Sequence, residues 1–236
     1  RVVPGDSVVP LGFSDPGAGS DLKAMSTRAS RDGDAYVIDG CNQYPDRLVA
    51  VGSVDMLDAN VDAVIRAWVG KGLAGLRIFT GGSTKDFDPS ELADPKSFKA
   101  WDALAELGLP MCIQTGPIGL PQVAMLAKRF PTVNIILDHL ARPDVLDGPP
   151  YMKADGLFAL AHLPNIYLKL TPRIFGDVKK EKASAETFFP RVAEAFGAHR
   201  MAWGSNFPTS PGTLKEILAQ AQAGLDCLSA EDRSWV

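Results

Sequence analysis

From residue 48 onward, short apolar runs alternate with amphipathic segments, and this alternation limits the fold more than any other feature of the chain. Segment 60–71 is a helix candidate, because its apolar residues recur at the i, i+3, i+4, i+7 spacing of one helical face. These residues are Val61, Val64, Ile65 and Trp68. The flanking runs at 47–55 and 72–79 are nearly continuous in apolar residues, as strands buried on both faces are. The pattern predicts a parallel sheet covered by helices.

The number of strand–helix units limits the fold class further. Six strand–helix units can be counted between Arg47 and Ala223. A (β/α)8 TIM barrel needs eight. We therefore predict an α/β fold of the TIM-barrel type that lacks its first two strands. An open doubly wound sheet tolerates six units and is the alternative.

Residues 1–40 follow a different pattern. A polar, alternating run is followed by an Asp-Gly turn at Asp32 and Gly33 and then by an apolar run, Tyr36 to Ile38. This is typical of a β-hairpin, because glycine supplies the positive φ that the turn demands. The amino-acid composition and the spacing of the apolar residues both change near Gly40. We expect a hairpin segment over 1–40 and a barrel over 41–236.

Composition and charge exclude several classes of function. The chain has 46% hydrophobic and 22% charged residues and a net charge of −4, with no run of Lys or Arg. These values are ordinary for a soluble protein and give no attraction to nucleic acid or acidic membranes. No apolar stretch approaches the roughly 18 residues of a membrane span, and residues 1–12 lack the layout of a signal peptide. Three widely spaced cysteines indicate reduced thiols, so we expect a cytoplasmic protein.

Two stretches resemble known families. "GFSDPGAGSDLKAMSTRASRDGDAYVIDG" resembles the middle β-domain of acyl-CoA dehydrogenases, whose Pro-x-Ala-Gly-Ser-Asp loop lies against flavin and substrate. The resemblance stops at Gly40, and the helical domains that hold the flavin have no counterpart here. Bound FAD is therefore not expected. A flavin-binding fragment is the weakest of the three functional hypotheses considered for this chain.

The second resemblance covers residues 41–236 and is to the amidohydrolase-related TIM-barrel hydrolases, which include lactonases and non-oxidative decarboxylases. It rests on six phrases in family order: "YPDRLVAVGSVD", "GLAGLRIF", "WDALAELGLPMCIQTG", "NIILDHLARP", "NIYLKLT" and "RMAWGSNFP". The resemblance implies a hydrolase that acts on a small carboxylated substrate such as a lactone. The competing hypothesis is a non-catalytic barrel remnant.

In such barrels the chemistry lies at the carboxyl ends of the strands. Here these ends carry a mixed set of polar residues: Asp55, Arg77, Gln114, His139, Lys169 and Asn206. We expect His139, Lys169 and Asn206 to be catalytic, and Arg77, Gln114 and Asp55 to bind substrate. His139 would polarise the scissile carbonyl and Arg77 would hold a carboxylate. A salt bridge from Arg77 or Lys169 to a nearby acid is the structural alternative.

A metal is not expected in this chain. The family resemblance implies a His-x-His pair on the missing first strand, a His where Gln114 stands, and in many members an Asp where Asn206 stands. A catalytic zinc takes about three protein ligands, and these substitutions leave His139 alone. A divalent metal would need the missing strand to be supplied. We also expect Asp138, which precedes His139, to point toward the outer helices and away from the site.

Loss of two strands would leave two apolar edges in the barrel, which need covering. We predict that the hairpin at 27–40 pairs into the gap, or that another chain fills it, so a homo-oligomer is one outcome. A small molecule is the expected partner.

Overall fold

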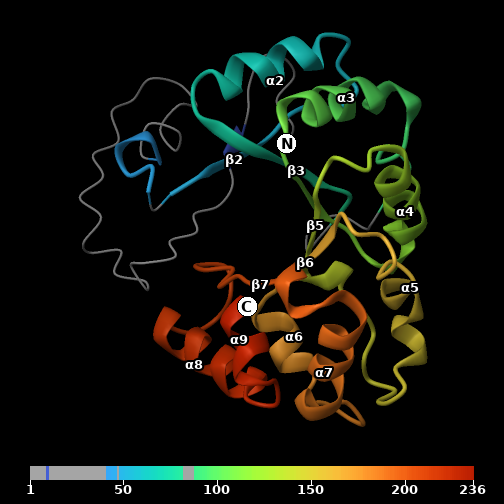
Figure 1. The fold of residues 1–236 in the computed structure, drawn as a ribbon, viewed down its shortest axis with the longest axis vertical. Helices are drawn as coiled ribbons and strands as arrows, with labels where there is room; N and C mark the ends of the chain where they lie inside the picture. The colour runs from blue at the N-terminus through green and yellow to red at the C-terminus, as the bar shows by residue number, and fades with distance from the viewer. Residues whose placement is uncertain (1–8, 11–40, 47, 82–87) are drawn as a thin grey trace.

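The computed structural model describes residues 9–10, 41–46, 48–81 and 88–236. They form a seven-stranded sheet in the order β1 to β7, with β1 antiparallel to β2 and the strands β2 to β7 parallel (Figure 1). The strands are β1 (Val9–Pro10), β2 (Ala50–Ser53), β3 (Leu73–Phe79), β4 (Met111–Gln114), β5 (Ile135–Asp138), β6 (Ile166–Leu170) and β7 (Met201–Trp203). The helices are α2 (Val61–Val69), α3 (Phe98–Leu107), α4 (Leu120–Arg129), α5 (Asp155–Phe158), α6 (Pro172–Asp177), α7 (Ala185–Phe196), α8 (Leu214–Leu225) and α9 (Ala230–Trp235).

The sequential strand order decides between the two predicted folds. A doubly wound sheet reverses its strand order at a switch point. In this sheet each strand from β2 to β7 lies beside its neighbours in sequence. The prediction of six strand–helix units in a TIM-barrel-like arrangement is therefore confirmed. Among the described strands, no pairing joins β7 back to β1 or β2, so the barrel is not closed.

The helices form where the sequence pattern predicts them. Helix α2 buries Val61, Ile65 and Trp68, which are three of the four residues of its predicted apolar face. Helix α3 ends at Gly108, whose φ of 65° is left-handed and suits glycine at a helix C-terminus. Helix α8 starts with a capping box between Thr213 and Glu216, in which each residue binds the other's backbone N–H.

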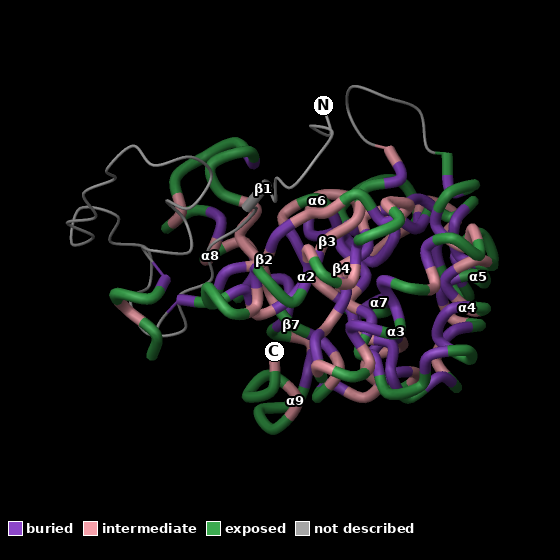
Figure 2. The backbone as a smooth tube through the Cα atoms, turned by 90° about the horizontal axis from the view of Figure 1, so that it is seen from above, coloured by how far each residue is buried: buried purple, intermediate pink, exposed green. Residues whose placement is uncertain are grey.

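The two faces of the sheet differ in burial. In β4, Met111 and Ile113 are fully buried, whereas Cys112 and Gln114, which alternate with them, stay partly exposed. The buried residues belong to one core with the inner residues of α2, α3 and α4, and Figure 2 shows this burial along the backbone. Because side chains alternate along a strand, the other face collects the polar residues of neighbouring strands.

In the described part of the chain, a further segment meets each edge of the sheet. Val9–Pro10 pairs with the β2 edge. At the other edge, the Trp203 N–H donates to the Val236 carbonyl at 3.2 Å. The predicted hairpin at 27–40 lies outside the described residues, so its predicted pairing stays a prediction. None of the described helices has the length and apolar character to cross a membrane.

Candidate functional site

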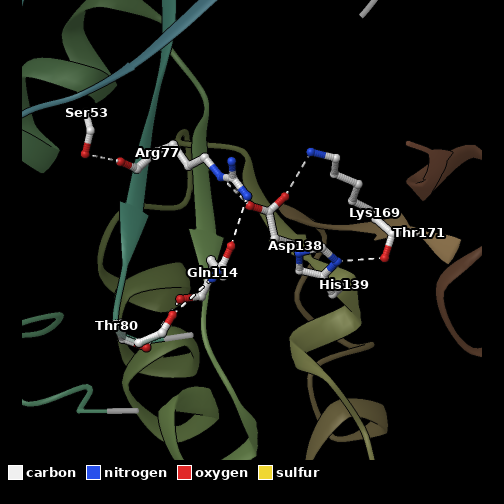
Figure 3. Close-up of polar contacts among 9 residues, drawn as sticks. Ser53, Arg77, Thr80, Gln114, Asp138, His139, Lys169 and Thr171 are labelled. Carbon is white, nitrogen blue, oxygen red and sulfur yellow. Dashed lines mark hydrogen bonds and ion pairs between the residues drawn. The ribbon is translucent and has the colours of Figure 1, made fainter. Parts of the chain in front are cut away.

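Asp138, the last residue of β5, is the centre of a charged cluster on the less buried face of the sheet. Its side chain is fully buried. Its Oδ2 lies 2.6 Å from Arg77 Nε, and its Oδ1 lies 3.1 Å from Lys169 Nζ. The three side chains come from β5, β3 and β6, and they converge in Figure 3. We call Arg77, Gln114, Asp138 and Lys169 the Asp138 cluster.

The prediction that Asp138 points toward the outer helices is wrong. That prediction took His139 as a strand residue and assigned Asp138 the opposite face. In the structure β5 ends at Asp138, and His139 has a φ of 56°, outside the extended region. Alternation within the strand places Asp138 with Ile136, opposite the fully buried Leu137. Asp138 therefore lies on the same face as Arg77 and Lys169 and belongs to the candidate site.

Asp138 stays ionised at neutral pH. Burial of its carboxyl group opposes ionisation, but the attraction of Lys169 and Arg77 outweighs burial, and the pKa is lowered below its ordinary value. Two cations thus share one carboxylate. The Asp138 cluster keeps a net positive charge, and that charge suits an anionic group of a ligand.

Gln114 holds the guanidinium group of Arg77 in place. Its Oε1 accepts a hydrogen bond from Arg77 Nη2 at 3.1 Å, and its Nε2 donates to the Gly81 carbonyl at 3.0 Å. Nearby, the hydroxyl groups of Thr80 and Thr115 lie 2.9 Å apart. With both ends of its amide in use, Gln114 acts as a positioning group for Arg77.

His139 lies next to the cluster in sequence and binds a different partner. Its Nδ1 lies 2.7 Å from Thr171 Oγ1, and the residue is 9% exposed. Burial lowers the His139 pKa to about 4, so the imidazole is neutral at pH 7. The backbone from His139 to Arg142 is left-handed at four successive residues, a conformation that costs roughly 1–2 kcal/mol per residue. Strain of this kind is concentrated at functional sites.

The low pKa of His139 predicts a loss of stability in acid. The unfolded chain binds a proton near pH 6.5, while the folded protein binds it only near pH 4, so the unfolded state gains protons first as the pH falls. We expect the free energy of unfolding to fall between pH 6.5 and 4, with about 3 kcal/mol attributable to His139. Urea unfolding over this range, compared between the wild type and His139→Gln, measures that contribution. Parallel pH dependence in the two proteins would contradict it.

Two of the predicted site residues, Asp55 and Asn206, make hydrogen bonds outside the Asp138 cluster. The Asp55 carboxylate accepts a hydrogen bond from the Leu57 N–H at 2.9 Å in the turn after β2 and is exposed. Asn206 Nδ2 donates to Ser210 Oγ at 3.1 Å, and Asn206 has a φ of 50°. The structure therefore brings together Arg77, Gln114 and Lys169, with His139 alongside, and shows no described contact from Asp55 or Asn206 to them.

Thr171 is a residue of the candidate site that the sequence analysis missed. It follows β6 two positions after Lys169, so strand alternation puts both side chains on the same face. The two-residue spacing of Lys169 and Thr171 within "YLKLT" could have indicated that Thr171 lies beside the candidate site. Thr171 is fully buried, and its hydroxyl group meets His139.

The described residues do not fit the divalent metal that the family resemblance implies. No group of three or more His, Cys, Asp or Glu side chains in the described ranges is placed to hold a metal ion. Asp138 already faces two cations, which would repel a third. His139 uses Nδ1 for Thr171. The donor set favours binding an anion.

Two curated proteins resemble parts of this chain in sequence. An L-fucono-1,5-lactonase of Burkholderia ambifaria is 29% identical over 124 residues, which are 52% of this chain and 43% of the lactonase. The chain thus spans less than half the length of that relative. A 40-residue stretch, 17% of this chain, is 50% identical to an acyl-CoA dehydrogenase of Mycobacterium tuberculosis and covers 10% of it. That local resemblance is confirmed, and the boundary at Gly40 stays a prediction.

Solved structures share the architecture at low identity. An amidohydrolase of Burkholderia multivorans with bound zinc superposes with a TM-score of 0.70 at 21% identity, covering 89% of this chain and 77% of that one. A 2-pyrone-4,6-dicarboxylic acid hydrolase homologue from Pseudomonas putida gives 0.68 at 17% identity, covering 86% and 74%. The model of the amidohydrolase family matches residues 4–236, nearly the whole chain. This protein belongs to the amidohydrolase family.

Proposed function

We propose that this protein hydrolyses a small carboxylated substrate such as a lactone. Family membership and the lactonase relative support a hydrolase, and the name of the Pseudomonas putida neighbour refers to a dicarboxylate substrate. The observation that carries the proposal is the Asp138 cluster, in which Arg77 and Lys169 share a single buried carboxylate. The remaining positive charge is available to a substrate carboxylate.

The proposed reaction assigns one task to each group. Arg77 and Lys169 bind the substrate carboxylate, so Lys169, which the sequence analysis expects to be catalytic, has a binding role here. Gln114, expected there to bind substrate, instead keeps the guanidinium group oriented. The neutral imidazole of His139 donates a hydrogen bond to the scissile carbonyl oxygen, where negative charge develops. Water then adds to the carbonyl carbon, the ring C–O bond breaks, and the proton released by the water passes to the departing oxygen. Roles for Asn206 and Asp55 stay predictions without a supporting contact.

Acid release from a panel of carboxylated lactones tests this proposal. We expect the purified chain to hydrolyse at least one of them faster than buffer does, and His139→Gln to lower that rate by about 100-fold or more. Asp144→Asn, which changes an exposed ion pair with Lys153, is the matched control and should keep the wild-type rate. A panel with no turnover above the rate in buffer alone would instead favour the non-catalytic remnant.

We also predict that the chain holds no stoichiometric catalytic metal. The sequence contains three histidines and no His-x-His pair, and the described donor set repels a divalent cation. Elemental analysis of dialysed protein should find far less than one zinc or manganese ion per chain. A content close to one ion per chain would overturn this prediction.

A further inference from the structure

Thr171 precedes α6 and is placed to cap it, yet its hydroxyl group does not do so. In the same chain, Thr213 and Ser229 cap α8 and α9 by accepting a backbone N–H with their side chains. Thr171 has the extended backbone of an N-cap residue but makes no side-chain cap hydrogen bond. Its hydroxyl group lies 2.7 Å from His139 Nδ1 instead. The Thr171 hydroxyl group therefore contacts the imidazole ring and does not cap the helix.

The hydrogen of this contact can be assigned by counting donors. Thr171 is fully buried, and its hydroxyl group has no other hydrogen-bond partner among the described residues. A buried hydroxyl hydrogen needs an acceptor, because water cannot reach it. If His139 Nδ1 carried the hydrogen, the Thr171 hydrogen would be left without an acceptor in the described part of the chain. The favoured arrangement has Thr171 donating to Nδ1.

The other ring nitrogen of His139, Nε2, then carries the hydrogen. No described residue binds Nε2. Burial keeps the ring neutral, with its pKa near 4. A neutral imidazole has one donor and one acceptor, and here the acceptor is occupied.

We propose that Thr171 is a positioning residue that fixes His139 as the Nε2–H tautomer, making His139 a hydrogen-bond donor to the substrate carbonyl oxygen and excluding it as a general base. This inference rests on the proposed function for its catalytic meaning. The tautomer itself does not depend on which substrate is bound. The left-handed turn that ends at Arg142 begins at His139 itself.

Nitrogen NMR of the full chain labelled with 15N-histidine tests the assignment at pH 7. Three histidines give three rings, and loss of one in His139→Gln identifies the signal of interest. We expect a pyridine-type shift at His139 Nδ1 and a pyrrole-type shift at Nε2 in the wild type. Thr171→Ser, which keeps the hydroxyl group, should preserve both shifts. Thr171→Val should move both toward values averaged over the two tautomers.

Two results would overturn the proposal: a pyrrole-type Nδ1 in the wild type, or an unchanged tautomer in Thr171→Val. The wild-type spectrum decides the tautomer even if Thr171→Val fails to fold. Thr187→Val removes a hydroxyl group that binds Tyr151, and it should leave the His139 signals unchanged. With a substrate in hand, Thr171→Val should lower kcat more than it changes KM, and Thr171→Ser should restore kcat. If no lactone is hydrolysed, the proposed function fails while the NMR result stands.

Discussion

Replacing Asp138 with asparagine is expected to lower the free energy of unfolding by about 3 kcal/mol, the low end of the range for breaking a buried ion pair. The amide keeps the shape of the side chain but removes the one charge that balances Arg77 and Lys169. The low end applies because the Lys169 side chain is 33% exposed and keeps part of its hydration, whereas that of Arg77 is 15% exposed. Urea denaturation at pH 7 measures the change.

A matched control and a second variant separate charge from packing. Asp144→Asn breaks an ion pair with Lys153 whose side chains are 45% and 60% exposed, and it should cost roughly 0–1 kcal/mol. Adding Lys169→Met to Asp138→Asn removes one uncompensated cation and should recover part of the lost stability. Equal losses for Asp138→Asn and Asp144→Asn would show that the buried carboxylate does not balance the two cations.

The parallel sheet was predictable because its strands are buried apolar runs and its helices have one apolar face. These are local patterns, and α2 and the end of α3 at Gly108 follow them closely. The open barrel formed by the described strands was predictable from the count of strand–helix units. The pairing of Val9–Pro10 with β2 was not, because a two-residue antiparallel contact leaves no periodic signal in the sequence.

The sequence predicted which strand ends carry the residues of the candidate site, but it did not predict which of these residues contact one another. Arg77, Gln114 and Lys169 follow from the rule that barrel chemistry lies at the carboxyl ends of strands. Asp138 was assigned to the wrong face because the sequence does not show that β5 ends before His139 and that the chain turns left-handed there. The Thr171–His139 contact joins two strand ends that are 32 residues apart in the sequence. At that separation the spacing of two residues does not predict whether their side chains meet.

His139→Gln is expected to lower kcat/KM by about 100- to 1000-fold, the usual loss when one donor to a developing oxyanion is removed. The effect should be similar for every lactone that the enzyme accepts, because each presents the same carbonyl group to His139. Thermal unfolding at pH 7 serves as the control, and the folded variant should retain a cooperative transition. A variant with more than a tenth of the wild-type kcat/KM would contradict the assigned role.

The central claim is that the Asp138 cluster recognises a carboxylate, and a matched pair of lactones tests it most directly. The pair shares one ring, with a free carboxylate in one compound and its methyl ester in the other. We predict that the wild type prefers the carboxylate by about 100-fold in kcat/KM, because a charged hydrogen bond contributes about 1.5–3 kcal/mol. Arg77→Gln should reduce this preference to roughly tenfold or less, while His139→Gln should lower both rates and keep the ratio. Equal hydrolysis of the two compounds by the wild type, or an unchanged ratio in Arg77→Gln, would contradict the claim.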